Sequence, residues 1–248
     1  MKNNNIEQNV KGNDNKQTTI VVQGDYVVGL QREEVIGLIK EYCQTDIDQI
    51  IQIVTERLNS IDEKNRKKPE KRVFVPLLQQ LSYSLDEEPI KAFYRKLLES
   101  SMDKTKTVHP SFVQIISQLD SDEVKILNSM TPHESIIYPL IDVRMKTKNT
   151  KGNGITLISN FSDIGYGKCD VPGNICSYLE NLERLKIIEI PALLTIVDKT
   201  KYDALKQHPA IVSSLTQYNG IPDITIEYDE KLFRLTRFGV SFLNACKG

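Results

Sequence analysis

Apolar side chains recur with helical spacing over the first half of the chain, and this periodicity restricts that region to packed helices. In residues 46–68, DIDQIIQIVTERLNSIDEKNRKK, they alternate steps of four and three: Ile47, Ile51, Val54, Leu58 and Ile61. This spacing places them on one helix face, as in the seam of a packed helix pair. Two heptads are too few for an extended coiled coil, so the seam predicts core packing.

The flanking segments have the same periodicity. Residues 31–44 predict one amphipathic helix, and residues 73–103 predict two antiparallel helices with Pro76 early in the first. Ile90, Phe93, Leu97 and Leu98 form the apolar face of the last helix. We therefore expect a helical bundle over residues 31–104.

Residues 1–30 have a different character. Residues 1–17 are rich in Asn, Lys and Gln and predict a disordered polar tail. Residues 18–30, TTIVVQGDYVVGL, contain β-formers on both sides of a Gln-Gly-Asp turn and predict a short β-hairpin prefix. An isolated hairpin is marginal in water, so the segment needs either its own domain or the same segment of a second chain. Ile20, Val22, Tyr26 and Val28 are the candidate self-association residues.

The totals limit the partners and the compartment. A net charge of −1 creates no global field that would attract nucleic acid or anionic lipid, so such binding would require a local basic patch. The four cysteines form no CxxC pair, and no apolar run approaches the ~20 residues of a membrane span. We expect a cytoplasmic protein that has no membrane contact, cofactor or metal.

The stretch VHPSFV places His109 next to Ser111 with Pro110 between them, which raises the question of catalysis. A catalytic Ser–His pair also needs an orienting carboxylate and oxyanion donors, and the serine lies in no Gly-rich elbow. Proline favours the first turn of a helix and holds the preceding residue extended. His109, Pro110, Ser111 and Phe112 therefore predict a helix start, and Ser121 is the expected N-cap of the next helix.

Residues 75–127 carry a distinctive order of motifs: a helix that ends in a leucine pair and SMD, then VHPSFV, QL, DE and IL. In this order and spacing the segment resembles the abortive-infection alpha (Abi-alpha) family of bacterial anti-phage proteins. A looser likeness extends to LENLERLKII and LTRFGVSFLNAC near the C-terminus. The resemblance implies a role in anti-phage defence, and it supplies no catalytic residues.

Residues 105–248 predict a winged-helix-like domain with an insertion at about 191–226. The pattern has a helix at 175–185, a strand at 187–190, a returning strand at 232–235 and a terminal helix capped by Thr236. The charges of the candidate recognition helix cancel, which favours packing or protein contact over DNA binding. The expected fold class is therefore mainly α (α+β).

Two basic segments are candidate phosphate contacts. One is KNRKKPEKR at residues 64–72, although such a run is more typical of a solvated helix end and linker. The other contains Arg144, Lys146, Lys148 and Lys151 and is the candidate nucleic-acid contact. The chain contains no GxxxxGK[ST], GxGxxG or HExxH motif.

Together these features predict a non-enzymatic anti-phage protein of the abortive-infection type that recognises a phage or host component. A protein partner is expected, with a homo-oligomer through residues 18–30 as a separate prediction. The alternative is a winged-helix regulator that binds nucleic acid. A third class, a hydrolase or nuclease, would require carboxylates brought together from distant segments.

Overall fold

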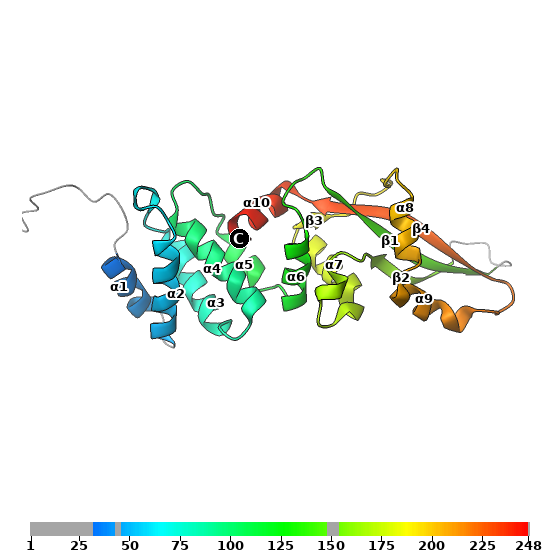
Figure 1. Cartoon of the computed structure of the whole chain (residues 1–248), viewed down its shortest axis with the longest axis horizontal. Coiled ribbons are helices and arrows are strands. Elements are labelled where there is room, and N and C mark those ends of the chain that lie inside the picture. Colours follow the sequence, from blue (N-terminus) through cyan, green and yellow to red (C-terminus); the bar gives the residue numbers. More distant parts are fainter. Residues whose placement is uncertain (1–31, 43–45, 148–153, 248) are drawn as a thin grey trace, which may run out of the picture.

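The computed structural model describes residues 32–42, 46–147 and 154–247 as an elongated molecule (Figure 1). Helices fill one end, an antiparallel sheet extends to the other, and the C-terminal helix α10 lies between them. The chain is thus a mixed α and β protein with more helix than strand. The predicted polar tail and β-hairpin prefix at residues 1–30 lie outside the described residues. No helix in the described part is long and apolar enough to cross a bilayer.

The helical end is organised around α4, which packs against α2, α3, α5, α6 and α10. The elements here are α1 (Arg32–Tyr42), α2 (Ile47–Asn59), the 3-10 turn η1 (Glu63–Asn65), α3 (Lys71–Tyr83), α4 (Glu88–Met102), α5 (Ser111–Ile116) and α6 (Ser121–Ser129). Helices α5 and α6 also contact α4, so the helical packing extends to α6.

The predicted seam of α2 is only part of its buried face. Val54 and Leu58 are buried as expected, but Ile50 and Ile53 are also buried, whereas Ile47 and Ile51 are partly exposed. The helix contacts α1, α3 and α4 together. A helix covered by several neighbours buries a wider stripe than the two positions per heptad of a coiled-coil seam.

The sheet has the order β2-β1-β4-β3 and is antiparallel throughout. Its strands are β1 (Ile137–Thr147), β2 (Ile155–Phe161), β3 (Ile188–Glu189) and β4 (Ile224–Leu235). Strand β1 pairs with β4 along its whole length, from Ile137 opposite Arg234 to Thr147 opposite Ile224. Short helices accompany the sheet: η2 (Tyr166–Lys168), η3 (Pro172–Asn174), α7 (Ile175–Arg184), α8 (Thr200–Lys206), α9 (Pro209–Leu215) and η4 (Thr216–Tyr218).

The C-terminal helices and strands occur in the predicted order. Helix α7 leads into β3, β4 returns beside it, and α10 (Arg237–Cys246) begins at Thr236, whose hydroxyl accepts a hydrogen bond from the amide of Gly239. Strand β4 is longer than predicted because β1 supplies hydrogen-bond partners along nearly all of it. The finer winged-helix assignment stays a prediction.

Candidate functional site

The basic linker before α3 and the lysine-containing turn after α4 are distant in the sequence but lie side by side at the helical end. The amide of Lys67 donates to the carbonyl of Met102 at 2.8 Å, and the amide of Lys104 donates to the carbonyl of Asn65 at 2.8 Å. Between these bonds Arg66 and Asp103 form an antiparallel bridge. The linker before α3 is therefore held against the turn after α4.

A hollow of about 350 Å³ opens where the two segments meet. Its lining consists of Lys67, Lys68, Glu70, Val73, Ser101, Lys104, Lys106, Thr107 and Val108. We call it the basic hollow. Its volume is near the lower end of the roughly 300–1,000 Å³ that is typical of small-molecule sites.

Most of the positive charge in the basic hollow has no carboxylate partner. The ammonium group of Lys67 donates to the carbonyl of Lys106 at 3.0 Å, which braces the two segments. Within the described part of the chain, no carboxylate forms an ion pair with Lys68, Lys104 or Lys106. Glu70 lies 2.6 Å from the guanidinium Nε of Arg72. Three ammonium groups thus remain available for an anion.

Asp103 lies beside the hollow, and its carboxylate is occupied by its own turn. Oδ1 accepts hydrogen bonds from the amide of Thr105 at 2.8 Å and from its hydroxyl at 2.7 Å. Burial opposes ionisation, but these bonds and the charges of Lys106 and Lys67 lower the pKa of Asp103 below its usual value. The lysines therefore act electrostatically on a group that is not their ion-pair partner.

The first turn of α3 borders the same hollow. Glu70 is its N-cap residue, forms no side-chain capping bond, and no acidic residue follows in the first turn. The amide groups at a helix N-terminus carry a partial positive charge. This partial charge adds to that of the lysines.

In two other hollows each cation has a hydrogen-bond or ion-pair partner. In a hollow of about 430 Å³, each cation has an acceptor: Arg57 and Lys96 with Glu99, Arg95 with Glu56, and Lys247 with the carbonyls of Asn128 and Met130. In another, of about 300 Å³, Arg234 pairs with Glu189 and Arg237 pairs with Glu134. Lysines with neither a carboxylate nor a carbonyl acceptor in the described chain distinguish the basic hollow from both.

His109 and Ser111 lie at the start of α5. The Nδ1 atom of His109 is 2.6 Å from the hydroxyl of Ser111 and accepts a hydrogen bond from the Ser111 amide at 3.2 Å. The ring of His109 packs against Phe112 and Phe238, each with a centroid distance of 5.9 Å. The His109 ring therefore contacts the first turn of α5 and the aromatic side chains beside it.

The expectation that Ser121 caps α6 is wrong by one residue. Asp120 is the N-cap: its carboxylate accepts from the amide of Asp122 at 2.8 Å, and Glu123 accepts from the amide of Asp120 at 2.7 Å. A carboxylate at the N-cap with Glu at the third helical position forms a capping box. This reciprocal pair makes Ser121 the first residue of the helix, not its cap.

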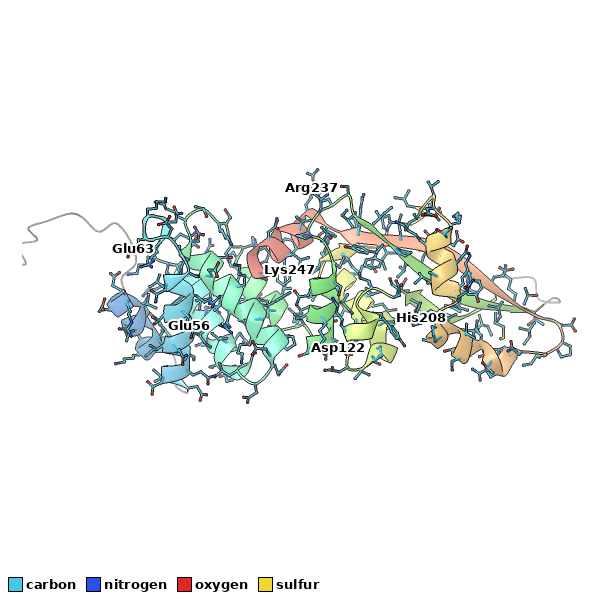
Figure 2. All side chains as sticks on the ribbon, in the orientation of Figure 1. Glu56, Glu63, Asp122, His208, Arg237 and Lys247 are labelled. Atoms are coloured by element: carbon cyan, nitrogen blue, oxygen red, sulfur yellow. The ribbon has the colours of Figure 1, made fainter. Side chains whose placement is uncertain are left out.

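Asp122 has a role that the sequence analysis missed. Its side chain is almost fully buried between α6 and α7 (Figure 2). It accepts hydrogen bonds from the amides of Asp170 and Val171 at 2.8 Å, from the Tyr178 hydroxyl at 3.2 Å and from Lys125 at 2.8 Å. Burial opposes ionisation, but these donors lower the pKa of Asp122 to about 2. This junction attaches α6 to the loop before α7.

The predicted nucleic-acid contacts are divided by the structure. Arg144 and Lys146 lie on β1 and pair across the sheet with Asp229 at 2.9 Å and Glu227 at 2.5 Å, respectively. Lys148 and Lys151 lie outside the described residues, as do Ile20, Val22, Tyr26 and Val28. In the part of the chain that is described, no group of three His, Cys, Asp or Glu side chains is placed to hold a metal ion.

The fold and the hollow define a class: an elongated α and β protein whose candidate site is a basic binding hollow on its helical end. The family profile described as abortive infection alpha matches residues 44–246. The chain belongs to the abortive infection alpha family.

No curated protein matches the chain. A solved structure of an uncharacterized protein from the hydrocarbon-degrading marine bacterium Alcanivorax borkumensis SK2 is similar, with 14% identity and a TM-score of 0.35, over 55% of this chain and 92% of that one.

Proposed function

We propose that this chain limits phage propagation by binding an anionic phage or host component in the basic hollow. Membership of the abortive infection alpha family supports the defence role. The observation that supports the binding site is the convergence of Lys68, Lys104 and Lys106, without carboxylate partners in the described chain, on one hollow.

In this proposal the chain recognises its ligand and does not transform it. The two groups in the lining that resemble catalytic ones already have partners: Glu70 pairs with Arg72, and the Ser101 hydroxyl donates to the carbonyl of Leu98 at 2.7 Å. In this proposal the lysines bind the charge of the ligand equally in the ground state and in any transition state. Uniform binding of this kind gives affinity and no rate enhancement.

The test compares phage plating on hosts that express three forms of the chain. The hollow variant carries Lys68→Gln, Lys104→Gln and Lys106→Gln. The matched control carries Lys40→Gln, Lys186→Gln and Lys201→Gln, which remove the same charge from exposed sites elsewhere. We expect the wild type and the control to reduce plaque number. The hollow variant should lose the protection by about tenfold or more, since each lost charge-assisted bond contributes about 1.5 kcal/mol or more.

Equal amounts of soluble protein and equal thermal midpoints establish that the three forms are comparable. Full protection by the hollow variant would contradict the proposed site. Loss of protection by both variants would trace the effect to net charge and would also contradict it.

A further inference from the structure

The lining of the basic hollow limits which part of a ligand it can hold. Its cations are all lysines. A lysine ammonium is a compact point charge with three donors, and it binds phosphate oxygens without the planar two-bond geometry that arginine imposes. No aromatic side chain is part of the lining, so no platform is provided on which a nucleobase would stack. The hollow is therefore suited to phosphate and not to a base.

The charge of the lining exceeds that of a single phosphate. Lys68, Lys104 and Lys106 contribute three positive charges without carboxylate partners in the described chain, and Lys67 adds a fourth that already donates to a carbonyl. A single phosphate monoester carries about −1.5 to −2 at neutral pH. A diphosphate or triphosphate supplies enough negative charge to balance three or four lysines, whereas one phosphate does not.

The size of the hollow favours a short ligand. Its volume of about 350 Å³ is near the lower end of the range of small-molecule sites. A phosphate chain fits a hollow of this size, whereas a nucleic-acid duplex would extend beyond it.

From these three features we infer that the basic hollow binds the condensed phosphate chain of a small ligand, held by Lys68, Lys104 and Lys106 with no discrimination of the base. The inference rests on the proposed function because it names the ligand class of the same site. Lys68 comes from the linker and the other two lysines from the turn after α4. A bound phosphate chain therefore bridges the two segments.

Calorimetric titration of the full chain in magnesium-free buffer tests the inference. The probes are inorganic tripolyphosphate, ATP, CTP, orthophosphate and a short DNA duplex. We expect tripolyphosphate and both nucleotides to bind one per chain with dissociation constants within about threefold of each other, and orthophosphate to bind about tenfold or more weakly, because it engages fewer lysines. Tripolyphosphate that binds tighter than both nucleotides would identify inorganic polyphosphate as the preferred source.

The hollow and control variants described above separate specific binding from general charge. The hollow variant should lose about tenfold or more in affinity for tripolyphosphate, and the control should match the wild type. The affinity of the hollow variant should also depend less steeply on salt, because fewer ammonium–phosphate contacts remain. An absence of binding by the wild type, equal loss in both variants, a tenfold preference between ATP and CTP, or tighter binding of the duplex would each overturn the inference.

The plating and binding results distinguish the two proposals. If the hollow variant loses protection while the wild type binds no condensed phosphate, the ligand class is wrong and the proposed function stands. If the hollow variant loses phosphate binding but protects fully, the ligand class stands and the proposed function is wrong.

Discussion

At the scale of single residues, Asp122 is the side chain whose replacement should disturb the fold most sharply. One carboxylate oxygen accepts from the Asp170 amide and Lys125, and the other accepts from the Val171 amide and Tyr178. In Asp122→Asn, either orientation of the amide turns an NH2 group toward one pair of donors. We expect a loss of about 3 kcal/mol in the free energy of unfolding, measured by urea denaturation.

Asp170→Asn is the matched control. Asp170 accepts from the same lysine at 2.7 Å, but its side chain is 81% exposed. Exposed ion pairs contribute about 0–1 kcal/mol, so this change should be nearly neutral. Equal losses in the two variants would contradict the role given to burial at this junction.

Asp122 also makes the stability of the fold depend on acid pH. The pKa of Asp122 is lowered from 3.8 to about 2, so its charged form stabilises the folded state above the unfolded pKa. That stabilisation is lost as the pH falls through the folded value. The difference in unfolding free energy between wild type and Asp122→Asn should therefore shrink as the pH falls from about 5 to 2. A constant difference over this range would show that the carboxylate charge is not the cause.

At the scale of elements, the position of α10 depends on Gly239. A Cβ atom built there would lie 2.0 Å from the carbonyl oxygen of Ile187. One turn earlier, the hydroxyl of Thr236 donates to the carbonyl of Lys186 at 2.6 Å and holds the same segments together. Gly239→Ala must therefore push α10 away from the segment before β3. We expect a loss of about 1–3 kcal/mol, measured by thermal unfolding.

Gly37→Ala is the control for glycine replacement in a helix. Gly37 is exposed in α1, and a Cβ atom there would have no neighbour within 4 Å. Alanine has the higher helix propensity, so stability should rise by up to about 1 kcal/mol. A destabilised Gly37→Ala, or a neutral Gly239→Ala, would contradict the packing described for these helices.

At the scale of the whole molecule, local patterns predicted the helices and the cap at Thr236 but placed the cap of α6 one residue too late, and pairings between distant segments were not predictable. Thr236 was expected as a cap because its signal lies within one turn. The basic run at residues 64–72 was visible as charge, but its meeting with Lys104 and Lys106 depends on the bridge between Arg66 and Asp103. The length of β4 likewise depends on β1. The Asp122 junction depends on amides contributed by a distant loop.

Helix α10 joins the two ends of the molecule, and we therefore expect their stabilities to be interdependent. Phe242 is fully buried, with ring centroids 5.9 Å from Phe93 of α4 and 5.4 Å from Phe112 of α5. At its other end, α10 follows directly after β4. Phe242→Ala should cost about 3–5 kcal/mol. Because α10 contacts both α4 and β4, amide hydrogen exchange should accelerate in α4 and in the paired strands β1 and β4 together.

Ser241→Ala supplies the comparison, since Ser241 is exposed on the same helix and its hydroxyl donates only to the carbonyl of Arg237 at 3.0 Å. The amide exchange rates of the Ser241→Ala variant should match those of the wild type. If Phe242→Ala accelerates exchange in α4 while β1 and β4 keep their protection, the sheet is stable without the helical end. In that case α10 joins two independent units. Acceleration in both places shows that the hollow and the sheet belong to one cooperative structure, so that a ligand bound at the helical end also stabilises the distant strands.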